Sequence, residues 1–276
     1  MDKACPLGKR VANLAARKND MKSLFDISGK TAIVTGGSSG IGAMIARGFV
    51  ENGVKTYISA RKEGPLLAKA EELSKLGECI PIQADLSKVE GIESLVAQVS
   101  AKEDHIDILV NNAGANWVVP IEEFPEAGWD KVMDINIKSI FFMTQKCLPL
   151  LRAKATHEDP SRVINTASIH GFDNPGMPAY AYSASKSGVI HLTKHLATDL
   201  APGHVNVNAI APGFFPSNMT KAATSNDAIY KHTVAQIPRK RAGEPEDIAG
   251  TAIFLASRAG AWIDGHTIVL DGGMIA

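Results

Sequence analysis

The stretch that decides the fold is "TAIVTGGSSGIG", residues 31–42. Its first five residues are apolar or β-branched and predict a buried strand, and a glycine-rich turn follows at once. The glycines are spaced Gly-x-x-x-Gly-x-Gly, which differs from the Gly-x-Gly-x-x-Gly fingerprint of dinucleotide-binding folds. The physical properties are the same, because glycines permit a tight turn and the next helix offers free N–H groups to a phosphate. Ser38 and Ser39 add hydroxyl donors, whereas the alternative is a turn that binds nothing.

The rest of the chain alternates short β-rich runs with longer helical patterns. Several of the runs are continuously apolar, as in strands that are covered on both faces. Further strands are predicted at 55–59, 79–83, 106–111, 162–166, 205–210 and 266–270, and helices at 41–52, 63–76, 88–102, 129–152, 182–201 and 245–257. This order predicts a single-domain α/β fold, a Rossmann-type doubly wound parallel sheet of about seven strands with helices on both faces. The least regular region, 212–243, is expected to be a loop that covers the substrate.

Composition narrows the function classes. The formal net charge is zero and 45% of residues are hydrophobic, so neither disorder nor a nucleic-acid partner is indicated. No apolar run reaches the roughly 18–20 residues that span a bilayer, so no membrane partner is expected. The three cysteines, Cys5, Cys79 and Cys147, form no C-x-x-C pair, which favours reduced thiols in a cytoplasmic protein. His191 and His195 are spaced to share a metal, but no third ligand accompanies them, so no metal site is predicted.

Residues 1–22 stand apart from the predicted domain, which is expected to cover residues 23–276. The segment is basic and loosely amphipathic, and it lacks the apolar core of a secretory signal. Asp2 and the scarcity of serine argue against an organellar transit peptide. An N-terminal extension and an upstream or vector-derived start are weighed equally.

The end of the second predicted strand, "YISARK" (57–62), bears on the choice of cofactor. In dinucleotide folds an acid at this point binds the ribose hydroxyls, whereas an arginine accommodates a 2′-phosphate. Ala60 takes the place of the acid and Arg61 and Lys62 follow, which favours NADP(H) and leaves NAD(H) as the alternative. Asp85, in "ADLS", either accepts a hydrogen bond from the adenine amino group or caps the following helix. In "NNAG" (111–114), Asn112 can pin neighbouring backbone, and the next two residues leave room for a cofactor.

A second polar group follows the fifth strand. "INTAS" brings Ser168 to the edge of the sheet, and Tyr182 and Lys186 lie four apart on one helix face. A lysine ammonium favours the phenolate form of a tyrosine, whose pKa is otherwise about 10, and so allows proton transfer near neutral pH. Ser168 could stabilise negative charge on a substrate oxygen. Asn136, through its side chain or a kinked backbone, could hold a water that links Lys186 to solvent. Each residue also has a structural alternative: Asn136 could be a hydrogen-bonded core amide, Ser168 a helix cap and Tyr182 a packing aromatic.

Taken together, these motifs resemble those of the short-chain dehydrogenase/reductase family. "TGGSSGIG", "NNAG", Asn136, Ser168, "YSASK" and "APG" (211–213) occur in that family's order and spacing, over residues 23–276. "NNAGANW", "DPSRVINTASIHG" and "APGFFPSNMT" look like the branch that includes bacterial rhamnolipid-pathway 3-oxoacyl reductases. The resemblance implies that Ser168, Tyr182 and Lys186 form the catalytic triad and that Asn136 completes a proton relay. Lys186 would also bind the nicotinamide ribose.

The resemblance extends to cofactor and substrate residues. Pro212, Gly213 and Phe215 would line the nicotinamide carboxamide, and Ser217 stands where the family often has threonine. The expected cofactor-binding residues are Gly36, Ser38, Ser39, Gly40, Ile41, Gly42, Arg61, Asp85, Leu86, Asn112, Ala113, Gly114, Tyr182, Lys186, Pro212, Gly213, Phe215 and Ser217. No basic residue lies inside "TGGSSGIG", so the choice of NADP(H) depends mainly on Arg61. The expected substrate-pocket residues, which could equally be packing residues, are Trp117, His170, Phe172, Phe214 and Met219.

The sequence therefore predicts an NADPH-dependent reductase of a ketone, either a 3-oxoacyl or another small carbonyl compound, with Tyr182 as general acid. The alternatives are an NAD(P)-dependent secondary-alcohol or sugar dehydrogenase and a non-catalytic nucleotide-binding protein. The predicted helices 129–152 and 182–201 carry more apolar residues than one core-facing stripe needs, for example Phe141, Phe142 and Ile190. The surplus predicts burial between subunits of a homo-oligomer, a tetramer or a dimer. Burial within one subunit is the alternative.

Overall fold

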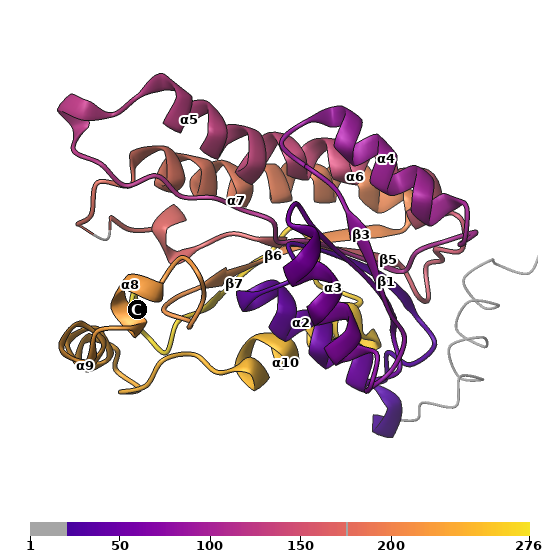
Figure 1. The fold of residues 1–276 in the computed structure, drawn as a ribbon. Coiled ribbons are helices and arrows are strands. Elements are labelled where there is room, and N and C mark those ends of the chain that lie inside the picture. Colours follow the sequence, from indigo (N-terminus) through magenta and orange to yellow (C-terminus); the bar gives the residue numbers. More distant parts are fainter. Residues whose placement is uncertain (1–20, 175) are drawn as a thin grey trace, which may run out of the picture.

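Seven parallel strands form one sheet in the order β3-β2-β1-β4-β5-β6-β7 (Figure 1). A computed structural model describes residues 21–174 and 176–276, so most of the predicted N-terminal extension lies outside the described residues. The strands are β1 Thr31–Thr35, β2 Lys55–Ala60, β3 Cys79–Gln83, β4 Ile108–Asn111, β5 Ser161–Thr166, β6 Val205–Pro212 and β7 Thr267–Leu270. All seven predicted strands are confirmed, as is the doubly wound Rossmann-type fold.

The strand order reverses beside β1, whose neighbours are β2 and β4. At such a switch point the crossovers leave the sheet in opposite directions, so a crevice opens at the carboxyl ends of the strands. The two strands that flank this crevice end at Thr35 and Asn111. The crevice is therefore bordered by the glycine-rich turn and by the "NNAG" segment.

Helices cover both faces of the sheet (Figure 1). Alternate residues of each strand point to opposite faces, so Val34 packs with one helix layer and Ile33 with the other. The first layer comprises α2 Gly40–Glu51, α3 Glu63–Leu73 and α10 Pro245–Ala256. The second comprises α4 Val89–Ser100, α5 Glu126–Met133, α6 Ser139–Arg152 and α7 Tyr180–Leu200. Short 3-10 turns lie at η1 Met21–Ser23, η2 Ile121–Glu123, η4 Ile169–Gly171, η5 Ala201–Gly203 and η6 Arg258–Gly260.

The structure differs from the predicted elements in two places. The predicted helix 129–152 begins at Glu126 and is interrupted by a π-helical turn, η3 Asp134–Lys138. Residues 212–243 are not a plain loop, because they contain α8 Lys221–Thr224 and α9 Asp227–Gln236. Asn226 caps α9 by accepting hydrogen bonds from the N–H groups of Ala228 and Ile229, at 3.1 and 3.2 Å. Neither short helix buries a residue, so no apolar periodicity marked them in the sequence.

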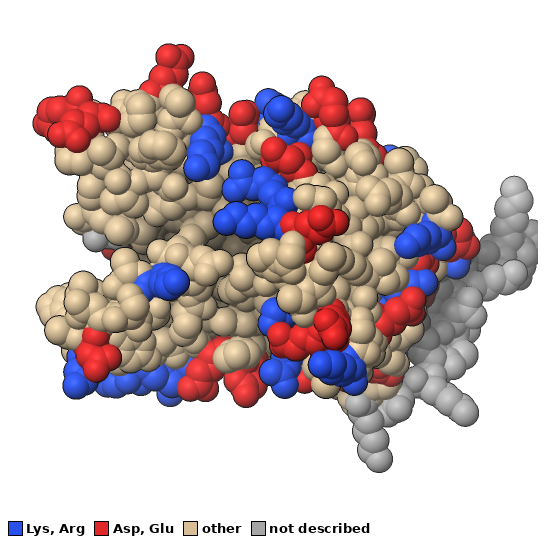
Figure 2. Space-filling view, viewed as in Figure 1, with Lys and Arg blue, Asp and Glu red and all other residues tan. Residues whose placement is uncertain are grey.

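The two faces of the crevice are formed by different elements. Figure 2 shows a hollow between the surface over α5 and α7 and the surface over α8 and α9, with Lys and Arg side chains gathered at its inner end.

No helix within the described residues is both long and apolar enough to cross a membrane.

Candidate active site

The turn between β1 and α2 requires glycine. Gly36 has a φ of 67°, and a Cβ added there would lie 2.9 Å from Asn112 Nδ2 and 3.0 Å from Ala113 Cα. Gly40 also has a positive φ, 55°. Ser39 is the N-cap of α2, but its side chain caps no N–H group. The first N–H groups of α2 are thus left for a ligand, and this arrangement fits a pyrophosphate.

Asn112 joins the ends of β4 and β1, as predicted. Its Nδ2 donates to the Thr35 carbonyl at 2.9 Å, and its backbone N–H donates to Thr35 Oγ1 at 2.9 Å. The Ala113 N–H donates to the same hydroxyl at 3.1 Å. Asn112 therefore contributes to the cofactor crevice by fixing the turn that borders it.

The ends of β2 and β3 carry the residues that could recognise the adenosine end of a cofactor. Arg61 is exposed and immediately follows β2, and its attraction helps to lower the pKa of Asp85. Burial raises the pKa of Asp85. Hydrogen bonds from the Ser87 hydroxyl and N–H, at 2.8 and 3.2 Å, lower it, and together with the charge of Arg61 they exceed the effect of burial. Asp85 forms this turn, whereas Lys88 is the N-cap of α4. An exposed guanidinium in this place fits a 2′-phosphate.

Ser168, Tyr182 and Lys186 come together at the carboxyl end of β5. The hydroxyl of Ser168 lowers the pKa of Tyr182, so the two side chains are neighbours. Lys186 Nζ lies 5.5 Å from the centroid of the Tyr182 ring and donates to the Thr166 carbonyl at 2.6 Å. Ser168 also caps η4, because its Oγ accepts the His170 N–H at 3.2 Å. The helix-cap interpretation and the catalytic one are therefore both consistent with this serine.

In the protein without cofactor, the pKa values of Tyr182 and Lys186 are shifted differently from the sequence-based expectation. Burial raises the pKa of Tyr182, and the neighbouring Ser168 hydroxyl offsets part of that rise. Burial also lowers the pKa of Lys186 to about 8. The tyrosine pKa is therefore raised rather than lowered, because burial disfavours the phenolate, and the ammonium of Lys186 donates to a carbonyl instead of to the Tyr182 hydroxyl.

Asn136 holds two segments together. Its Oδ1 accepts the Ala115 N–H at 2.8 Å, and its Nδ2 donates to the Ala115 carbonyl at 2.9 Å and to Ser185 Oγ at 3.0 Å. Both amide hydrogens are used by these bonds, and the side chain is 0% exposed. The backbone of the π-helical turn, where the Ser139 N–H donates to the Asp134 carbonyl, is a second place that could hold a water for Lys186.

Comparison with known proteins decides the family. A family model described as enoyl-(acyl carrier protein) reductase matches residues 36–275. A rhamnolipids biosynthesis 3-oxoacyl-[acyl-carrier-protein] reductase of Pseudomonas aeruginosa is 44% identical over 92% of this chain and 99% of its own. The chain belongs to the short-chain dehydrogenase/reductase family. It is therefore an oxidoreductase of C=O and CH–OH groups that uses a nicotinamide cofactor.

Other members of the family act on different substrates. A 2-dehydro-3-deoxy-D-gluconate 5-dehydrogenase of Escherichia coli is 38% identical over 92% of this chain and 98% of its own. The solved structure described as the Pseudomonas aeruginosa RhlG/NADP active-site complex superposes with a TM-score of 0.89 at 44% identity, covering 91% of this chain and 98% of that one. Relatives named for acyl substrates and for sugar-acid substrates are thus similar to this chain at 44% and 38% identity.

In this family member the segment after β6 crosses the crevice. A Cβ added to Gly40 would lie 3.1 Å from Ser217 Cβ, and one added to Gly114 would lie 3.7 Å from Met219 Cε. Between them, Asn218 Nδ2 donates to Ser39 Oγ at 3.2 Å. Three consecutive residues therefore connect this segment to the phosphate turn and to the end of β4.

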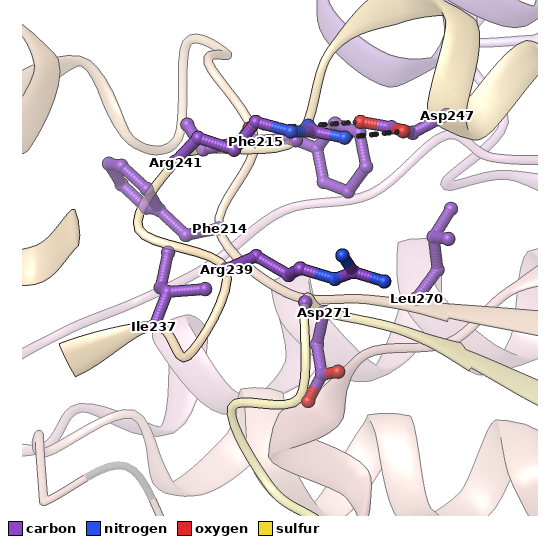
Figure 3. Close-up of a pocket in the computed structure, with 11 residues that line it drawn as sticks. Phe214, Phe215, Ile237, Arg239, Arg241, Asp247, Leu270 and Asp271 are labelled. Carbon is purple, nitrogen blue, oxygen red and sulfur yellow. Dashed lines mark hydrogen bonds and ion pairs between the residues drawn. The ribbon is translucent and has the colours of Figure 1, made fainter. Parts of the chain in front are cut away.

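The residues just before this crossing are arranged by packing. Gly213 lies against Asp271, because an added Cβ would come within 2.7 Å of its Cβ. Phe215 is 3% exposed and its ring covers Gly243 in the core, so only its backbone is left to contact a nicotinamide. Behind it is a cavity of about 470 Å³ (Figure 3), which the Ser168–Tyr182 pair does not line.

The five predicted substrate residues separate into two groups. Trp117 packs over Gly128 with Lys131 Nζ 5.1 Å from its ring, and Phe214 packs on Tyr230 with ring centroids 6.0 Å apart. These two have structural partners. Of the other three, Phe172 and Met219 are exposed, and His170 is partly buried against the Tyr182 ring.

A buried polar network beneath the site was not predicted. Asn111 Nδ2 donates to Thr144 Oγ1 at 3.2 Å and to Asn165 Oδ1 at 3.0 Å. Asn165 Nδ2 donates to Thr193 Oγ1 at 3.0 Å. The chain of bonds joins β4 and β5 to α6 and α7, and so positions the helix that carries Tyr182. Its only signal in the sequence was an asparagine near the end of each strand.

Proposed function

We propose that this protein uses NADPH to reduce the ketone of a 3-oxoacyl thioester. The observation that carries the proposal is a set of large apolar side chains left exposed around the crevice. Phe172 and Met219 are each 50% exposed, and Val118 and Met177 are 49% and 42% exposed. The Val119 N–H donates to the Pro178 carbonyl at 3.3 Å, so the segments of Val118 and Met177 adjoin. Exposed apolar surface of this kind suits an acyl chain.

The preference for NADPH is supported by the charge at the end of β2. Ala60 cannot accept hydrogen bonds from the ribose hydroxyls through its side chain, whereas the adjacent Arg61 is exposed. Gly36 and the open N-terminus of α2 suit the pyrophosphate. The bound NADP in the RhlG complex supports the same assignment by similarity.

The catalytic cluster accounts for the proton that the reaction consumes. NADPH, when bound, supplies a hydride to the carbonyl carbon. The neighbouring hydroxyls of Ser168 and Tyr182 would hold the carbonyl oxygen between them. Tyr182 gives its proton to that oxygen, which becomes the alcohol, and the phenolate takes up a proton from solvent. Lys186, fixed by the Thr166 carbonyl, stabilises the phenolate while it exists.

The chain-length dependence of turnover tests this function. We expect kcat/KM for 3-oxoacyl thioesters to rise as the acyl chain lengthens, when NADPH oxidation is followed by absorbance. Each methylene that leaves water should contribute up to about 0.8 kcal/mol. A preference for 2-dehydro-3-deoxy-D-gluconate would instead support the sugar-acid dehydrogenase alternative, which the Escherichia coli relative favours.

We also propose that the protein is a cytoplasmic homo-oligomer. Met133, Ile137, Phe141, Phe142 and Leu192 line a shallow apolar depression between η3, α6 and α7. Phe141 is 39% exposed there, although its ring contacts Phe142. A second copy of the chain would bury this surface. The free, buried thiols of Cys79 and Cys147 suit a reducing compartment.

A further inference from the structure

His170 is the polar side chain beside the catalytic pair that the proposed chemistry does not use. It lies in η4, and its backbone N–H donates to Ser168 Oγ at 3.2 Å. Its imidazole crosses the Tyr182 ring edge to face, with centroids 5.4 Å apart and planes at 89°. His170 is thus fixed to both hydroxyl-bearing residues, to Ser168 through the backbone and to Tyr182 through its ring.

The two ring nitrogens of His170 differ in their surroundings. Nδ1 is enclosed and has no hydrogen-bond partner among the described residues. Burial also lowers the pKa of His170, so the neutral ring is favoured. A buried N–H without an acceptor costs more than a buried lone pair without a donor, so the single proton belongs on Nε2. The residue is only partly buried and Nε2 is not among the enclosed, unpartnered atoms, so we place Nε2–H on the open side of the ring.

We propose that His170 selects 1,3-dicarbonyl substrates by donating its Nε2–H to the thioester carbonyl while Tyr182 and Ser168 hold the ketone oxygen. The inference depends on the proposed reduction of 3-oxoacyl thioesters, whose second carbonyl is two carbons from the first. A neutral donor suits a neutral carbonyl, whereas a carboxylate would favour a cation. Lys186, the cation beside Tyr182, is 4% exposed and donates to Thr166, so it is not free for this role.

Two substrates and four variants test the proposal. The substrates are a 3-oxoacyl thioester and a 2-alkanone of equal chain length, which lacks the second carbonyl. His170→Phe keeps an aromatic ring and removes the donor, and we expect it to lower kcat/KM for the thioester roughly tenfold. The 2-alkanone should be reduced at a rate within about twofold of wild type. His191→Phe, the same substitution at an exposed position of α7, is the matched control and should change neither.

Amide variants test which nitrogen donates. In His170→Gln the new side-chain amide nitrogen reaches the place of Nε2, whereas in His170→Asn it reaches only the place of Nδ1. We expect His170→Gln to restore thioester turnover and His170→Asn to resemble His170→Phe. Each variant is first checked for unchanged NADPH affinity, which reports an intact fold.

Four results would overturn the inference, the last of them through the proposed function. Equal losses on both substrates would show that His170 supports Tyr182 structurally, and no loss on either would show that it does not contact the substrate. Restoration by His170→Asn rather than His170→Gln would show that Nδ1, and not Nε2, is the donor. Turnover of sugar ketones but of neither test ketone by the wild type would instead overturn the proposed function, and the inference with it.

Discussion

At the scale of single residues, burial controls the catalytic groups. Lys186 is buried and Tyr182 is partly buried, which disfavours their charged forms, so the tyrosine pKa rises and the lysine pKa falls. A bound oxidised nicotinamide would add positive charge beside them. The cofactor and Lys186 together, rather than Lys186 alone, would then favour the phenolate.

Tyr182→Phe should remove the proton donor and leave the fold unchanged. We expect kcat to fall by about 10²–10⁴-fold, the usual contribution of general acid catalysis. NADPH affinity should stay close to that of wild type, because the ring that packs against His170 is retained. Steady-state kinetics and fluorescence titration measure the two quantities. Residual turnover near the wild-type rate would mean that another group donates the proton.

Lys186 should make the stability of the cofactor-free protein depend on alkaline pH. Its pKa is about 8 in the folded protein, against 10.5 as the ordinary value. Between these values the unfolded chain binds the extra proton, so the free energy of unfolding contributed by Lys186 rises with pH. Thermal melts of wild type and Lys186→Met should therefore show wild type gaining stability relative to the variant over this window. Parallel curves would contradict the lowered pKa.

Arg61 should discriminate between the two nicotinamide cofactors. Its guanidinium can form charge-assisted hydrogen bonds to a 2′-phosphate, which NADH lacks. Arg61→Ala should weaken NADPH binding by roughly ten- to a hundredfold and leave NADH binding nearly unchanged. Lys75→Ala, an exposed cation beyond the end of α3, is a suitable control. Isothermal titration measures both affinities, and similar losses for NADPH and NADH would contradict the assignment.

At the scale of elements, the segment after β6 is held by few bonds. Thr220 Oγ1 donates to the Phe215 carbonyl at 2.7 Å and accepts the Ser217 N–H at 2.9 Å, which shapes the segment internally. Within residues 21–174 and 176–276, the exposed bond of Asn218 to Ser39 is the one side-chain hydrogen bond that joins it to the phosphate turn. This segment can therefore open at small cost while α10 and β7 stay in place.

Asn218→Ala should accelerate cofactor release. Loss of one exposed hydrogen bond corresponds to a change of a few-fold in rate. We expect stopped-flow displacement to give a faster NADPH off-rate, with little change in the rate of the chemical step in single turnover. Lys221→Ala, at an exposed position in α8, should leave the off-rate unchanged. An unaltered off-rate in Asn218→Ala would show that the bond does not retain the cofactor.

At the scale of the whole molecule, the helices that carry Tyr182 and Asn136 also carry the apolar depression around Phe141. A second copy seated there would stiffen α6 and α7 and hence the catalytic helix. Phe141→Glu would place a charge in that interface, where burial without a partner is costly. We expect light scattering with size-exclusion chromatography to report a smaller species than wild type. Phe172→Glu, an exposed aromatic beyond η4, is a control for added charge, and a monomeric wild type would contradict the assembly.

Local chemistry made much of this molecule predictable. The strand–turn–helix at 31–51 follows from an apolar run and from glycines that adopt positive φ, both of which are properties of adjacent residues. The four-residue spacing of Tyr182 and Lys186 places them on one face of any helix. These signals sufficed for the sheet and the family, and the structure brings the predicted catalytic residues Ser168, Tyr182 and Lys186 into one cluster.

The tertiary structure alone decided which groups those residues meet. Asn136 binds Ala115, the Phe215 ring turns into the core, and Met219 reaches Gly114 across the crevice. Each contact joins segments that are far apart in the chain, so its geometry depends on how helices and strands pack rather than on local pattern. The position of His170 beside Tyr182 arises in the same way, because the burial of its Nδ1 and its edge-to-face contact are set by neighbours that the sequence does not place.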